Sequence, residues 1–235
     1  MTRTYRMLAV ALTIALLPGL LVADEKRKSG TTKGGKAISL FDGKSLEGWD
    51  YHLVEPGVKM EDVWRVEDGV LICKGEPLGY ICTKQKFKNF KLTLQWRWAR
   101  GTEPGNSGVL LRATGEPKAF MLKCVEAQLK GGSAGDIWGF LGFQCAGDPE
   151  RFREIKDHEV LGNFMGVGVM KNAEKEPGQW NTCRIVLQDD QLTIFINGEK
   201  VNEATGCDVV PGTIALQSEG GEIHFRKIKL VPLDG

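Results

Sequence analysis

The sequence predicts an all-β fold, either a sandwich or a barrel, and three observations support it. Short runs of apolar residues alternate with polar ones, as in strands that bury one face. Turn signals rich in glycine separate these runs, and the chain holds 30 glycines. No apolar periodicity indicates a helix longer than about two turns, so alternating β and α units are not expected.

The expected strands follow one another from Ile38 onward. Segment 91–98 places Leu and Trp on one face and Thr, Gln and Arg on the other. Segment 192–196 alternates too and runs into Asn197-Gly198, a dipeptide that favours a two-residue hairpin. Alternation returns at 213–217, and a change of phase between Phe225 and Ile228 predicts a bulge in the last strand. Segment 131–180 is broken by Gly and Pro, so we expect loops there.

The chain before the expected domain has the features of an export signal followed by a linker. In residues 1–23, Arg3 and Arg6 precede the apolar run 7–17, and Ala23 precedes the expected cleavage point. An uncleaved anchor is the alternative, although the run is short for a membrane span. Residues 24–37 are polar and predict a flexible tether, and residues 38–235 suit one domain. We expect an exported protein, periplasmic or secreted, with no stable membrane span after signal removal.

Charge and cysteine content restrict the classes of partner. Removing Arg3 and Arg6 from the 31 Lys and Arg leaves 29, against 30 Asp and Glu, so no nucleic-acid partner is expected. The six cysteines fit no zinc spacing. Cys73 and Cys82 flank a turn and are the expected disulfide, with free, buried cysteines as the alternative.

Two stretches place polar side chains on one face of the expected sheet. In 106–112, Asn106 and Arg112 lie opposite the apolar residues, and in 125–130, Glu126, Gln128 and Lys130 do. A sheet face of this kind can bind a polar ligand. The alternative is an outer face that is merely solvated.

An ordered set of phrases resembles one bacterial family, the 3-keto-disaccharide hydrolases, also described as 3-keto-glucoside 1,2-lyases and 3-keto-2-hydroxyglucal hydratases. The resemblance covers about residues 38–232 and rests on the phrases at 39–49, 64–71, 105–112, 126–128, 135–139, 179–181, 197–198, 214–217 and 225–228. It implies a concanavalin-like jelly-roll sandwich of two antiparallel sheets. It also implies an enzyme acting on 3-keto-glycosides, downstream of a separate sugar 3-oxidoreductase. The chain departs from the family at Lys130, at Ser218-Glu219 and at Lys227, where Asp, His and Asn are common.

The chemistry implied by the resemblance needs a base, an acid and a group that stabilises an enolate. A ketone at C3 acidifies the hydrogen on C2, whose removal lets the substituent on C1 leave. Glu126 is the expected proton-transferring carboxylate. Arg112 is expected to stabilise the enolate, helped by Lys130. The alternative is a cross-strand ion pair between Glu126 and Arg112.

Further residues are candidates for binding the sugar. We expect Asn106 and Gln128 to hold hydroxyl groups and Trp138 to stack on a sugar ring, with ordinary loop packing as the alternative for Trp138. Gln217 and Arg226 are further substrate-binding candidates. Glu219 is a second carboxylate candidate, although the glycines after it suggest a plain turn.

The sequence leaves the cofactor and the class of function open. A divalent metal could polarise the ketone, but the three histidines are too scattered to identify ligands. No phosphate loop or dinucleotide fingerprint is present. A non-catalytic carbohydrate-binding module or a surface-interaction protein is the alternative to an enzyme, because jelly rolls serve all these functions.

Overall fold

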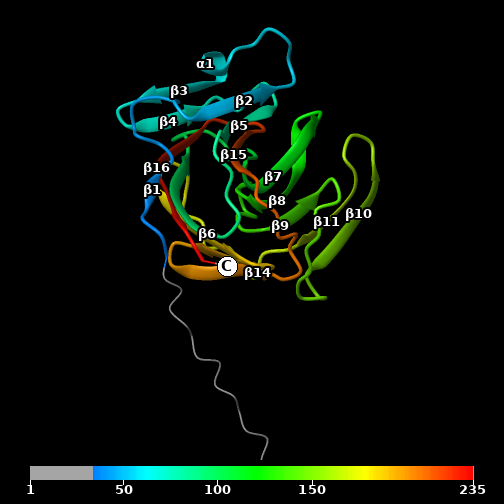
Figure 1. Ribbon diagram of the computed structural model, residues 1–235. Coiled ribbons are helices and arrows are strands. Elements are labelled where there is room, and N and C mark those ends of the chain that lie inside the picture. The colour runs from blue at the N-terminus through cyan, green and yellow to red at the C-terminus, as the bar shows by residue number, and fades with distance from the viewer. Residues whose placement is uncertain (1–33, 235) are drawn as a thin grey trace, which may run out of the picture. The chain divides into compact units, whose positions relative to one another are not determined.

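Two antiparallel sheets face each other in the computed structural model, which describes residues 34–234. The first sheet contains, in spatial order, β14 (Glu199–Ala204), β13 (Gln191–Ile196), β12 (Asn181–Gln188), β6 (Phe90–Trp98), β16 (Ile223–Pro232), β4 (Val70–Cys73) and β3 (Trp64–Glu67), and β1 (Ile38–Ser39) also pairs with β16. The second contains β10 (Phe152–His158), β11 (Gly162–Val167), β9 (Ile137–Phe140), β8 (Met121–Gln128), β7 (Gly108–Lys118), β15 (Thr213–Ser218), β5 (Gly79–Thr83) and β2 (Trp49–Leu53). This arrangement confirms the predicted jelly-roll sandwich (Figure 1).

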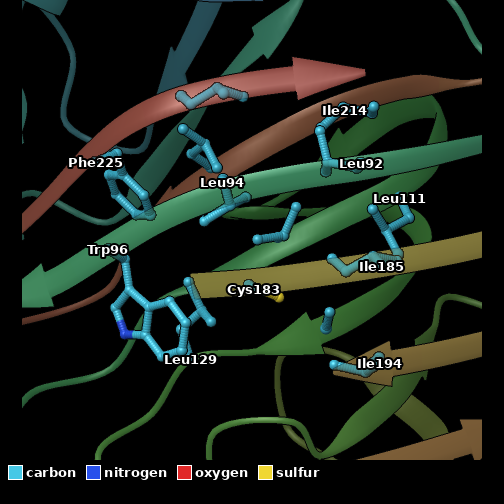
Figure 2. Close-up of a cluster of buried hydrophobic side chains, with 14 of the residues drawn as sticks. Leu92, Leu94, Trp96, Leu111, Leu129, Cys183, Ile185, Ile194, Ile214 and Phe225 are labelled. Carbon is cyan, nitrogen blue, oxygen red and sulfur yellow. The ribbon is translucent and has the colours of Figure 1, made fainter. Parts of the chain in front are cut away.

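The core lies between the two sheets and is built by the predicted alternation. On β6, Leu92, Leu94 and Trp96 are fully buried. They form one cluster with Leu111 of β7 and Ile214 of β15, which belong to the opposite sheet (Figure 2). Burial of one face per sheet, at about 25 cal/mol per Å² of apolar surface, is the main source of stability.

Two local predictions about turns and strands are confirmed. Asn197 and Gly198 both have positive φ, at 53° and 91°, and join β13 to β14 as a tight hairpin. Lys227 has φ 53° where the register of β16 against β6 shifts, which is the expected bulge. The helix expectation also holds within residues 34–234, where α1 (Met60–Val63) has four residues.

Three expectations differ from the structure. Segment 131–180 forms β9, β10 and β11 rather than loops alone, and β10 escaped recognition because its side chains are mostly exposed and do not alternate. All six cysteines are free, so the expected Cys73–Cys82 disulfide is wrong: Cys73 lies on β4 and Cys82 on β5 of the other sheet. Backbone pairing starts at Gly34 rather than Ile38, because Gly34 bridges Leu233.

The export signal at residues 1–23 and the first ten residues of the expected tether lie outside the described part of the chain. Within residues 34–234 no helix is long and apolar enough to cross a membrane.

Candidate functional site

The outer face of the second sheet carries the polar residues that the alternation of β8 predicts. Val125 and Ala127 point into the core between the sheets. Glu126 and Gln128 therefore point to the opposite face. Trp138 of β9 lies directly across from Glu126 in the strand pairing, so the acid and the indole share this face.

A cavity of about 790 Å³ lies over this face. Five of the residues proposed from the sequence line it: Asn106, Glu126, Gln128, Lys130 and Trp138. Its other lining residues include Asp136, Glu219, aromatic residues of β9 and β11, and residues of β10. The hairpin of β10 and β11 stands beside β9 at the edge of the sheet (Figure 1) and contributes one wall.

Glu126 is buried in the floor of the cavity with almost no exposed surface. Its Oε1 atom has no hydrogen-bond partner. Burial is the first cause that raises the pKa of this carboxyl well above its usual range, and the negative charges of Glu219 and Asp136 add to it. The raised pKa favours the protonated form of this carboxyl, which can donate a proton.

Gly108 of β7 makes room for that carboxyl. A Cβ at this position would overlap Oε1 of Glu126 and would lie 2.6 Å from Oε1 of Gln217. Gly108 is the partner of Gln128 in the pairing of β7 with β8. The absence of a side chain here lets Glu126 lie flat against the sheet.

Glu219 forms part of the cavity wall just after β15 and is only half-buried. Burial raises the pKa of its carboxyl to about 7, although the nearby Asn106 amide and the Lys130 ammonium favour the charged form. The backbone N–H of Asn106 donates to the carbonyl of Gly220 at 2.9 Å, which fixes the two loops against each other. The segment that the sequence suggested to be a plain turn thus brings a second carboxylate to the cavity.

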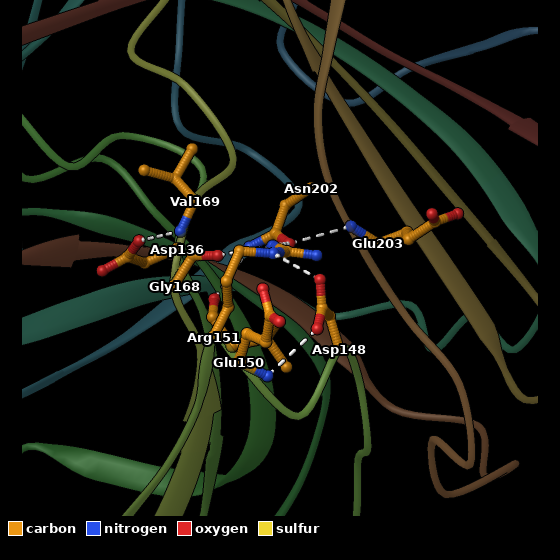
Figure 3. Close-up of polar contacts among 9 residues, drawn as sticks. Asp136, Asp148, Glu150, Arg151, Gly168, Val169, Asn202 and Glu203 are labelled. Carbon is orange, nitrogen blue, oxygen red and sulfur yellow. Dashed lines mark hydrogen bonds and ion pairs between the residues drawn. The ribbon is translucent and has the colours of Figure 1, made fainter.

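Asp136 is a cavity residue that the sequence analysis did not select, although it lies in the resemblance phrase 135–139. Its Oδ1 accepts a hydrogen bond from the N–H of Val169 at 2.6 Å. Close by, Arg151 donates to the carbonyl of Gly168 at 2.6 Å and to Oδ1 of Asn202 at 2.8 Å (Figure 3). These contacts fix the loop before β9 to the chain that follows β11, and so hold the cavity wall in place.

Arg112 does not reach the cavity, so the expectation that it shares the face of Glu126 is wrong. The residue has φ 49°, at a point where the register of β7 against β8 shifts. Because of this bulge, the side chain of Arg112 does not point to the sheet face that simple alternation predicts. Arg112 is fully buried, and it donates to the carbonyls of Lys88 and Asp208 at 2.7 and 2.6 Å and to Oδ1 of Asn89 at 3.0 Å. The alternative ion pair with Glu126 is absent as well.

Arg226 belongs to the other sheet, so the structure does not bring it to the cavity. It lies on β16, where its Nε donates to Oε1 of Gln95 at 2.8 Å and its guanidinium covers the ring of Trp180 at 3.9 Å. Gln217 is fully buried on β15 beneath the cavity and does not line it, and neither polar atom of its side chain makes a hydrogen bond of good geometry.

The structure identifies no ligand set for the divalent metal that the sequence left open. No group of three His, Cys, Asp or Glu side chains within residues 34–234 is arranged to hold a metal ion. A divalent metal at this site stays a prediction.

Known proteins share both the sequence pattern and the fold. A "3-keto-disaccharide hydrolase" from Bacteroides thetaiotaomicron is 31% identical over 84 residues, which are 32% of this chain and 27% of that protein. The match therefore spans about a quarter of that relative. A crystal structure from Parabacteroides distasonis, described as a "putative glycosyl hydrolase", is 26% identical with a TM-score of 0.57, covering 85% of this chain and all of that one. A carbohydrate-binding module from Bacillus subtilis shares the fold with a TM-score of 0.52 at 11% identity, covering 77% and 94% of the two chains.

The family model for the 3-keto-α-glucoside-1,2-lyase-like domain matches residues 36–231. That match includes every strand of both sheets, except the last residue of β16, and every residue of the cavity described above. This match over most of the chain shows that the protein belongs to the family of 3-keto-α-glucoside-1,2-lyase-like domains.

Proposed function

We propose that the protein is an exported enzyme that cleaves or hydrates 3-keto-glycosides by removing the proton on C2 and eliminating the substituent on C1. The observation that carries the proposal is a pair of carboxyls in one cavity, Glu126 and Glu219, both with a raised pKa. Pairs of titratable groups whose environments separate their pKa values are typical of acid–base sites.

In the elimination, one of the two carboxyls acts as the base and the other as the acid. Glu219, with a pKa of about 7, is ionised often enough near neutral pH to take the C2 proton. Glu126, kept protonated by burial, gives its proton to the oxygen leaving C1. The C2–H electrons form the new C1–C2 double bond as the C1–O bond breaks. Water can then add OH to C1 and H to C2, which gives the free 3-keto sugar.

The remaining polar residues of the cavity bind the sugar hydroxyls and stabilise the negative charge of the enolate. Lys130 takes the role that Arg112 cannot fill and stabilises negative charge on the ketone oxygen. One well-aimed donor contributes about 3 kcal/mol in comparable sites. Asn106 and Gln128 line the same part of the cavity and hold sugar hydroxyls. The ketone must be supplied by a separate oxidoreductase that acts on the C3 hydroxyl.

The test is turnover of a 3-keto-glucoside with a chromogenic leaving group by the purified chain, with and without added divalent cation. We expect release of the chromophore by the wild type, and Glu126→Gln should reduce kcat by at least about tenfold. Glu219→Gln should do the same. Unchanged kcat in both variants, or no release above buffer in any condition, would reject the enzyme and leave a sugar-binding protein, in which Glu126→Gln keeps its affinity for sugar.

A further inference from the structure

The cavity has two ends of different chemistry. One end is polar and contains Asn106, Glu126, Gln128, Lys130, Asp136 and Glu219. The other is apolar and mostly aromatic, with Phe120, Met121, Trp138, Phe140, Leu161 and Phe164. A site shaped only for a hydroxylated sugar ring would not need so large an apolar wall, because such surface is usually covered by apolar groups of a ligand.

The apolar end begins beside Glu126, at Trp138, and extends beyond the reach of the reacting sugar ring. Met121 and Glu126 are the first and sixth residues of β8, and five steps along a strand span about 17 Å. A ring whose C1 lies within hydrogen-bond reach of Glu126, about 3 Å, ends well short of Met121. The part of the apolar end that lies beyond Trp138 therefore faces whatever is attached to the sugar.

Phe164 of β11 is the centre of this wall. Its ring lies 5.6 Å from Trp138, 4.9 Å from Phe140 and 5.7 Å from His158, centroid to centroid. A Cβ on Gly166 would run into the indole of Trp138, so the indole lies flat on the backbone of β11. The aromatic surface is thus formed before a ligand arrives, which lowers the entropic cost of binding.

The polar side chains that line the cavity at this end are those of Arg153 and His158, both on β10. Nδ1 of His158 already accepts the N–H of Leu161 at 3.1 Å. Hydroxyl groups placed against Phe120, Phe140 and Phe164 would lose hydrogen bonds to water without replacing them, which is costly.

We infer that the apolar end is a subsite for the leaving group and that it selects a flat, apolar group, such as an aryl aglycone, over a second sugar. This inference rests on the proposed function and names its substrate class. Aromatic contacts of this kind contribute about 0.5–1.5 kcal/mol each beyond simple burial.

The kinetic experiment compares phenyl and methyl 3-keto-glucosides in the wild type and in Phe164→Ala. Phenoxide is the better leaving group in any enzyme, so the decisive quantity is how the variant changes the ratio of the two kcat/KM values. We expect Phe164→Ala to lower kcat/KM about tenfold for the phenyl substrate and less than about twofold for the methyl one. Phe195→Ala, on β13 of the first sheet, is the matched control and should leave the ratio unchanged. An equal loss on both substrates in Phe164→Ala would overturn the inference.

A binding experiment separates this inference from the proposed reaction. Phenyl and methyl glucopyranosides, in both anomers, lack the ketone and cannot react, so calorimetry reports affinity alone. We expect the phenyl glucoside to bind about tenfold more tightly, and the preference to vanish in Phe164→Ala but persist in Glu126→Gln. Equal affinities, or no measurable binding of either compound, would overturn the subsite. A phenyl preference in a protein that turns over no 3-keto-glucoside would overturn the reaction and keep the subsite.

Discussion

The floor of the cavity holds a residue that folding alone would not select. Glu126 lies in a fully buried position with an unpartnered oxygen, next to the amide of Gln217, which is also without a good partner. Buried polar groups without hydrogen bonds cost about 1–3 kcal/mol each. Residues of this kind are expected where function, rather than stability, decides the side chain.

Glu126 should make the protein less stable as the pH rises. The pKa of its carboxyl is raised in the folded state from the ordinary value of 4.5, so the native protein keeps a proton that the unfolded chain has already released. Stability is therefore fully present below pH 4.5 and falls above it, by up to about 1.4 kcal/mol per pH unit for one such group. Denaturant unfolding at about pH 5 and about pH 8 should show that Glu126→Gln gains stability over the wild type at the higher pH. A gain of equal size at both pH values would contradict this assignment.

Gly108 tests whether the position of that carboxyl matters for the reaction. In Gly108→Ala the new methyl group would displace the ends of the Glu126 and Gln217 side chains rather than backbone. We expect kcat to fall by about tenfold or more while the circular dichroism spectrum is kept. In the Glu126→Gln background the same substitution should have little further effect on kcat, because the two changes act on one group. If Gly108→Ala and Glu126→Gln lowered kcat by independent factors that multiply in the double variant, Gly108 would act on a group other than Glu126.

Among the elements, β7 shows how a single bulge changes a predicted function. Alternation along 106–112 correctly places Val109 and Leu111 in the core. It fails at Arg112, because a left-handed backbone conformation there cannot be read from residues whose types do not require it. The strand β7, which pairs with the strand that carries Glu126 and Gln128, thus uses its arginine for structure.

Arg112 is accordingly predicted to matter for stability and not for turnover. Its three hydrogen bonds join β7 to the chain before β6 and before β15, and Arg112→Met would remove the guanidinium donors to the carbonyls of Lys88 and Asp208. We expect a loss of about 3 kcal/mol or more in the free energy of unfolding. The exposed Arg184→Met on β12 should cost less than about 1 kcal/mol. Protein that remains folded should keep the wild-type kcat, and a loss of kcat without a loss of stability would restore a catalytic role for Arg112.

The β10–β11 hairpin is the element that could not be predicted from the pattern of apolar and polar residues. In β10 only Phe152 and Ile155 are half-buried, and the other side chains are exposed, so apolar and polar residues do not alternate. Phe164 and His158 therefore gave no signal as site residues, although both line the cavity. By contrast, β8 has one face buried between the sheets and one face with polar residues. Its alternation correctly predicted that Glu126 and Gln128 lie on the outer face of the sheet.

At the scale of the molecule, the sandwich could be predicted because β6, β12 and β13 of the first sheet bury alternate residues and turns such as Asn197-Gly198 are explicit. The convergence of Glu219 with Glu126 could not, because it depends on β15 lying beside β7, a long-range pairing that no local pattern specifies. The same holds for the cysteines. Cys73 and Cys82 are close in sequence and lie on different sheets.

The whole fold is expected to be stable without disulfides. One continuous core lies between two eight-stranded sheets, a domain of this size can bury enough surface to fold without disulfides, and all six cysteines are free. Alkylation of the purified protein in denaturant, without reductant, should therefore add six labels per chain by mass spectrometry. Omitting reductant should leave the melting temperature unchanged. A product with four labels would reveal one disulfide and contradict the arrangement described above.

The order of strands in the second sheet also determines when the site can exist during synthesis. Its floor needs β7 and β8 from the middle of the chain and β15 from near its end, and Glu219 follows β15 directly. A ribosome must therefore release almost all of the chain before the two carboxyls can meet. Until then the negative charge of Glu219 cannot add to the burial that raises the pKa of the Glu126 carboxyl.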